Sequence, residues 1–66
     1  MTNTEVAAQL REFAQEARTL QQHLRRLLEP GGLQDPATAR RLEDALRELE
    51  RLASTAQALA TLAETE

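Results

Sequence analysis

Residues 27–42 read LLEPGGLQDPATARRL and place both glycines and both prolines of the chain within seven positions. Pro30 removes a backbone N–H and disfavours helical geometry at Glu29, and a glycine directly after it can adopt the left-handed conformation that ends a helix. Asp35 and Pro36 then favour a new helix, since Asp is a preferred N-cap and Pro suits the first helical position. The stretch therefore predicts a turn between two helices.

The segments on either side of this turn carry an apolar heptad pattern. Thr2 and Glu5 have the spacing of a capping box, which places the first helix at about residues 3–28, the turn at about 29–35 and the second helix at about 36–63. Apolar residues then recur at alternating spacings of four and three, as in a coiled coil. The pattern predicts an all-α fold: a single domain over residues 1–66 that forms an antiparallel two-helix hairpin, completed by self-association or by a partner.

The heptad pattern also predicts which residues face each other within the hairpin. Folding the chain about its turn places Leu20 near Ala45 and Ala17 near Leu49, so that larger side chains tend to meet smaller ones. The predicted intramolecular seam comprises Val6, Leu10, Phe13, Ala17, Leu20, Leu24, Leu27, Leu42, Ala45, Leu46 and Leu49.

Composition narrows the functional classes. Twelve leucines and twelve alanines dominate the apolar residues, and the chain has no cysteine for a disulfide or a thiolate metal site. Eight arginines oppose eleven acidic residues, and the net charge of -3 gives no general attraction to nucleic acid or to an anionic membrane. No apolar run is long enough for a transmembrane span, and the first ten residues lack the pattern of a signal peptide. We therefore expect a cytoplasmic protein without membrane insertion.

Catalytic chemistry has little support in the sequence. His23 is the single histidine, and the carboxylate pairs Glu12 with Glu16 and Asp44 with Glu48 lack the surrounding groups that a metal or acid–base site needs. Gly31 and Gly32 lie between helices, not after a strand as in a phosphate-binding loop. We expect no catalytic residue, cofactor or metal, and hence no enzyme.

Nucleic-acid binding also has weak support. Arginines gather near the turn at positions 25, 26, 40 and 41, but acidic residues occupy the same neighbourhood and no aromatic residue is available there for base stacking. We expect no nucleic-acid partner.

The segment 52–63, LASTAQALATLA, carries no charge over twelve residues. One partner helix does not use so wide an apolar surface, which favours docking on another protein or assembly into a multi-chain bundle. The alternative is that the segment is simply a good helix former. The residues predicted to bind a partner are Leu52, Ala53, Ala56, Ala58, Leu59, Ala60, Leu62 and Ala63.

The loop GGLQDP and the final ALATLAETE, on a helical hairpin of this length, resemble the small co-chaperones of type III secretion needle subunits, the YscE/SsaE/EscE group. The resemblance covers about residues 10–62, and its most specific part is residues 33–36, which look like the loop of the SsaE-type branch. It implies a non-enzymatic protein that binds and stabilises a tetratricopeptide-like chaperone, and together they hold the needle subunit monomeric in the cytosol until export. It leaves open which face meets the partner.

Two functional hypotheses follow. The first is this co-chaperone, which caps a stack of helix pairs in its partner. The second is a homodimeric four-helix bundle that acts as a regulator or structural adaptor, since a hairpin without its partner is a possible homo-oligomer.

Overall fold

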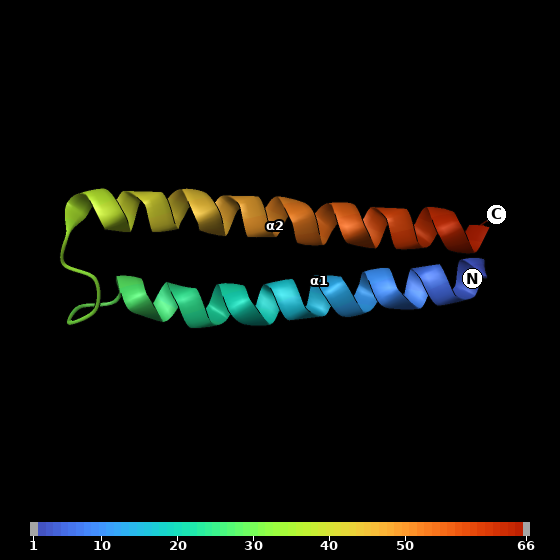
Figure 1. Cartoon of the computed structure of the whole chain (residues 1–66), viewed down its shortest axis with the longest axis horizontal. Helices are drawn as coiled ribbons and strands as arrows, with labels where there is room; N and C mark the ends of the chain where they lie inside the picture. Colours follow the sequence, from blue (N-terminus) through green and yellow to red (C-terminus); the bar gives the residue numbers. More distant parts are fainter. Residues whose placement is uncertain (1, 66) are drawn as a thin grey trace.

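The computed structural model describes residues 2–65, while residues 1 and 66 of the predicted domain lie outside this range. Two antiparallel helices lie side by side and are joined by a turn, which confirms the predicted all-α helical hairpin (Figure 1). The hairpin measures 47 × 15 × 14 Å. Its elements in chain order are helix α1, Asn3–Arg25, the short 3-10 helix η1, Arg26–Leu28, and helix α2, Pro36–Thr65.

Side-chain caps begin both helices. The Thr2 hydroxyl accepts a hydrogen bond from the Glu5 N–H at 3.1 Å and donates to the Glu5 carboxylate at 3.3 Å. At the start of α2, Asp35 Oδ2 accepts from the N–H of Thr38 at 3.1 Å and from its hydroxyl at 2.5 Å. These bonds satisfy backbone donors that have no acceptor within the first helical turn, so each helix has a defined starting residue.

Both glycines are needed in the turn. Gly31 has a φ of 92°, in the region that favours glycine. The N–H of Gly32 donates to the Glu29 carbonyl at 2.9 Å, and the N–H of Leu33 donates to the Leu27 carbonyl at 2.6 Å. A Cβ atom on Gly32 would overlap the Leu27 carbonyl oxygen. The chain thus reverses within a few residues by bringing its backbone against the end of η1.

Alanine dominates the contact between α1 and α2. Ala14, Ala17, Ala53 and Ala56 form a buried cluster, against which the partly buried Leu10 and Leu49 pack. Small side chains let two helices approach closely, and among residues 2–65 no large side chain is fully buried in the contact. The buried residues of this contact are Ala7, Ala14, Ala17, Gln21, Leu46, Ala53, Ala56 and Ala60.

The predicted seam is displaced by one heptad position from this contact. It was wrong for Phe13, Leu20, Leu27 and Ala45, which are exposed. Ala17 and Leu46 are buried as predicted, and the seam residues that are only partly buried are Val6, Leu10, Leu24, Leu42 and Leu49.

The displacement has a physical cause in the heptads themselves. Three of every seven positions are apolar in both helices, whereas a two-helix contact buries mainly two. The hairpin buries the heptad position that is rich in alanine, because small side chains there let the helices approach most closely. The alanines at this position are Ala7, Ala14, Ala53 and Ala60. The third apolar position, which holds the larger side chains, is left at the surface.

Candidate interaction surface

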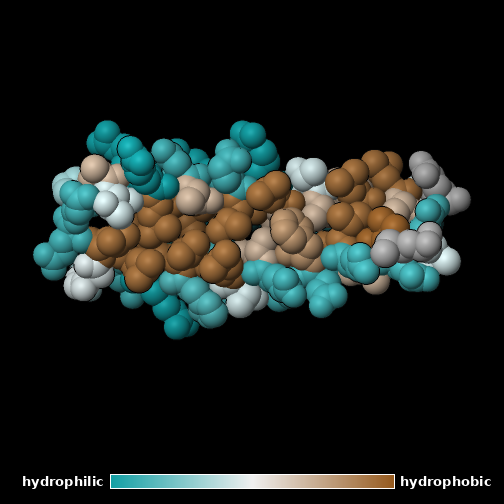
Figure 2. Space-filling model, in the orientation of Figure 1, coloured by the Kyte–Doolittle hydropathy of each residue, from teal (hydrophilic) through white to brown (hydrophobic). Residues whose placement is uncertain are grey.

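Large apolar side chains line one face of the hairpin, at the heptad position that the helix contact leaves uncovered. Their exposed fractions are 45–47%, far above those of the alanines beside them in the contact. We call this surface the apolar face and define it by Phe13 and Leu20 of α1, Leu27 of η1, and Leu52 and Leu59 of α2. Figure 2 shows the apolar surface extending from the turn toward the termini, with hydrophilic residues along much of both margins.

The spacing of these residues keeps them on one side of each helix. Along α1 and η1 they recur every seven residues, and Leu52 and Leu59 of α2 have the same spacing, so each set forms a line along its helix. Partly buried Leu10, Leu24 and Leu49 lie between the two lines. The result is a strip two helices wide, and exposed apolar strips of this kind mark interaction sites on soluble proteins.

The opposite flank of the helix contact is polar. Arg18 of α1 pairs with Glu50 of α2 at 3.2 Å and donates to the Gln57 side chain at 2.9 Å. Arg11 pairs with Glu64 in the same manner near the termini. We call this flank the charged edge. It ties the helices together on one side, and the apolar face lies on the other side.

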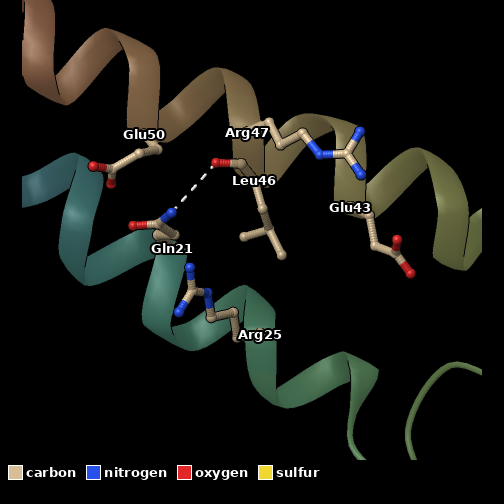
Figure 3. A pocket seen from close by; sticks show the side chains of 6 residues that line it. All are labelled: Gln21, Arg25, Glu43, Leu46, Arg47 and Glu50. Carbon is tan, nitrogen blue, oxygen red and sulfur yellow. Dashed lines mark hydrogen bonds between the residues drawn. The ribbon is translucent and has the colours of Figure 1, made fainter.

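A small open cleft lies on the charged edge toward the turn (Figure 3). The side chain of Gln21, 8% exposed at its floor, donates to the Leu46 carbonyl at 3.3 Å. Positively charged arginines and negatively charged glutamates form the walls. Their charges balance, so the cleft presents no net charge to attract an ionic ligand. Its lining residues are Gln21, Arg25, Glu43, Leu46, Arg47 and Glu50.

The residues predicted to bind a partner fall into separate groups in the structure. Leu52 and Leu59 are on the apolar face, and Leu62, 59% exposed, extends it near the end of α2. Ala58 is exposed on the side of α2 that faces away from α1, since each residue turns the helix by about 100°.

The remaining alanines of that set are buried or partly buried. Ala53, Ala56 and Ala60 are buried between the helices, and Ala63 is partly buried. Sequence reasoning also missed the contribution of α1, because Phe13, Leu20 and Leu27 had been assigned to the seam. The signal that separates the two sets is the heptad repeat of small residues, Ala7 with Ala14 and Ala53 with Ala60.

Within the described residues, two further kinds of feature are absent: a cluster that could hold a metal ion and a helix that could span a membrane. His23 is exposed, and residues 2–65 contain no group of three or more histidine, aspartate or glutamate side chains placed to hold a metal ion. Within the same range, neither helix combines the length and the apolar character needed to cross a membrane. The apolar face is therefore the feature of the described chain that best supports a functional role.

Comparison with known proteins gives no match to a family model, to a curated protein or to a solved structure. Its class is defined by the fold alone, as an all-α helical hairpin.

Proposed function

We propose that this chain is a non-enzymatic co-chaperone of a type III secretion system. In this role it binds a tetratricopeptide-like chaperone, stabilises it, and helps to keep the needle subunit monomeric in the cytoplasm before export. The observation that supports the proposal is the apolar face, because large side chains left about half exposed along a helical hairpin are what a helical partner would cover.

The physical logic of the role is that of a helical cap. Tetratricopeptide-like chaperones are stacks of helix pairs, and a terminal pair leaves apolar surface open unless another element covers it. A hairpin whose apolar face continues the stack would remove that surface from water. The charged edge, with Arg11 and Arg18 paired to Glu64 and Glu50, would face solvent in such a complex.

A homodimeric four-helix bundle that serves as a regulator or structural adaptor is the second candidate. The observation that favours it is the third apolar heptad position, since bundles of four helices bury a wider stripe than a two-helix contact does. In this case the apolar faces of two copies would cover each other.

Affinity isolation tests the proposal. The tagged hairpin is co-expressed with the genes that adjoin its own, and recovery of a tetratricopeptide-like chaperone together with a needle subunit is measured. Leu59→Glu, on the apolar face, should abolish recovery, because an unpaired carboxylate would be buried in the interface. Ala58→Glu adds the same charge on the far side of α2 and should leave recovery unchanged.

Two results would count against the co-chaperone. If Leu59→Glu recovers the chaperone as well as the unaltered chain does, the apolar face is not the docking site. If the unaltered chain recovers no such chaperone and sediments as a tight dimer, the adaptor is the better description.

A further inference from the structure

We propose that the occupant of the apolar face is a single amphipathic helix with basic residues bordering its apolar stripe at mid-length. This inference rests on the proposed function, whose binding site it uses, and it specifies the chemistry of the partner. It follows from the shape of the face and from the charges along its two borders.

The shape of the face fits one helix laid along the hairpin. Phe13 and Leu27 are separated by two heptads, or about 21 Å at the rise of an α-helix, and Leu52 and Leu59 line the neighbouring helix. Two parallel lines of side chains at seven-residue spacing present the holes into which the apolar residues of a third helix insert. A helix in this position would complete a three-helix bundle.

Carboxylates border the face on both sides near its middle. Glu16 lies three residues after Phe13 and four before Leu20, and is therefore next to both on the surface of α1. Glu48 has the same relation to Ala45 and Leu52 on α2. Both glutamates are exposed, so a helix seated on the face would lie between two negative charges.

These two carboxylates differ from those of the charged edge. Glu50 and Glu64 already pair with arginines of α1. Among residues 2–65, Glu16 and Glu48 take part in no ion pair. Their charge is therefore available to a partner, and lysine or arginine beside its apolar stripe would supply the complementary charge.

The same borders disfavour a second copy as the occupant. Two hairpins stacked face to face about a two-fold axis bring the borders of both copies together, so that the Glu16 and Glu48 side chains of one copy lie along the same rims as those of the other. Carboxylates would then line both rims of a contact from which water is partly excluded, and like charges in such a position are repulsive.

Charge along the borders also varies with distance from the turn. Toward the turn the corresponding border positions hold His23 and Arg41, and toward the termini they hold uncharged Gln9 and Thr55. The basic residues of the partner helix are therefore required near its centre, beside Glu16 and Glu48, and not along its whole length.

Two synthetic helices provide the probes for this inference. Both have 28 residues and the same leucine and alanine stripe, and they differ in having lysine or glutamate at the central border positions. Binding to the hairpin is measured by fluorescence anisotropy at probe concentrations that sedimentation shows to be monomeric. We expect the lysine probe to bind about tenfold more tightly than the glutamate probe at low salt, with the difference shrinking as salt is added.

Charge reversal of the hairpin supplies the matched control. Glu16→Lys with Glu48→Lys should invert the preference between the probes. Glu12→Lys with Asp44→Lys changes the net charge equally on the outer sides of the helices and should leave the preference as it was. Circular dichroism checks folding, and Glu16→Gln with Glu48→Gln, which should abolish the preference, serves if the reversal variant does not fold.

Three outcomes would overturn the inference. These are equal binding of the two probes, a preference that the outer pair of substitutions removes as readily as the border pair, and binding of neither probe by a chain that forms a tight dimer. Failure of the co-chaperone role is distinguishable, because the hairpin would then discriminate between the probes and yet recover no tetratricopeptide-like chaperone from co-expression.

Discussion

Gln21 of α1 donates a hydrogen bond from its side-chain amide to the backbone carbonyl of Leu46 in α2, at 3.3 Å across the helix contact (Figure 3). Both residues are buried, and Gln21 is a polar residue at a heptad position that is usually apolar in a helix contact. A buried amide needs a hydrogen-bond partner, and Gln21 reaches the Leu46 carbonyl in this alignment of the two helices. The bond therefore favours this register over alignments in which one helix has slipped along the other.

Replacing Gln21 tests this role. Gln21→Leu keeps the volume of the side chain, and the Leu46 carbonyl retains its acceptor role within α2, so the free energy of unfolding should change by less than about 1 kcal/mol. Gln21→Ala removes both the bond and buried volume and should cost about 1–2 kcal/mol. Urea denaturation followed by circular dichroism measures both. A loss for Gln21→Leu as large as that for Gln21→Ala would show that the bond matters more than the packing, because only Gln21→Leu keeps the buried volume.

The close approach of the helices predicts a strong effect of enlarging an alanine. Ala53 is fully buried in the contact, and Ala53→Leu should destabilise the hairpin by about 1–3 kcal/mol, because the added methyl groups force the helices apart. Ala58→Leu makes the same change on the exposed outer side of α2 and should be within about 0.5 kcal/mol of the unaltered chain. Equal thermal transitions for the two variants would mean that the contact is not packed tightly at Ala53.

The fold could be predicted from the sequence because its signals are local. The Gly and Pro cluster fixes the turn, the caps at Thr2 and Asp35 fix where the helices begin, and heptad spacing fixes their amphipathic character. These features depend on neighbouring residues alone. Which side of each helix meets the other depends on the relative free energies of alternative helix contacts. Because three positions per heptad are apolar and the contact buries mainly two, the sequence pattern does not decide which two are buried.

The turn supplies a prediction of its own. A Cβ atom at Gly32 would meet the Leu27 carbonyl oxygen, which is backbone and cannot rotate away. Gly32→Ala should therefore lower the free energy of unfolding by more than about 1 kcal/mol. Gln34→Ala, at an exposed position of the same loop, is the control and should have little effect. A thermal melt of Gly32→Ala that overlays that of the unaltered chain would contradict the observed path of the turn.

Acid should weaken the cap of α2. Hydrogen bonds from the Thr38 hydroxyl and the Thr38 N–H hold the pKa of the Asp35 carboxyl below its ordinary value of 3.8. Because the pKa is lower in the folded state, the ionised cap contributes stability that is fully present above the unfolded-state value and is lost as the pH falls through the folded-state value.

The matched variant for this pH effect is Asp35→Asn, which retains a capping side chain but does not titrate. Between about pH 6 and pH 2, its melting temperature should fall less than that of the unaltered chain. Thermal melts across this range measure the difference. If the two chains lose stability in parallel, groups other than Asp35 account for the acid dependence.

The candidate site was harder to predict than the fold for the same reason that the seam was. The charge-free run in α2 drew attention to Leu52 and Leu59, which are exposed, but it could not separate them from Ala53, Ala56 and Ala60, which are buried in the helix contact. The α1 half of the face was missed because assigning Phe13 to the seam removed it from the surface. The pairing of Arg18 with Glu50 is a long-range contact that identifies the opposite flank, and it is visible in the structure alone.

The two leucines Leu46 and Leu52 of α2 separate the helix contact from the apolar face. Leu46 is 7% exposed and Leu52 is 47% exposed, although both are apolar positions of the same helix. Leu46→Gln should cost about 2–4 kcal/mol, since it loses buried apolar area and places an amide at a buried position of the helix contact. Leu52→Gln should cost about 1 kcal/mol or less in the isolated hairpin, because much of that side chain is in water already.

The order of the two variants should reverse for binding, measured on the folded fraction of each variant. Leu52→Gln should weaken binding of the lysine probe helix, whereas Leu46→Gln should leave that binding nearly unchanged. A Leu52→Gln chain that is destabilised as strongly as Leu46→Gln would return Leu52 to the helix contact and remove it from the apolar face.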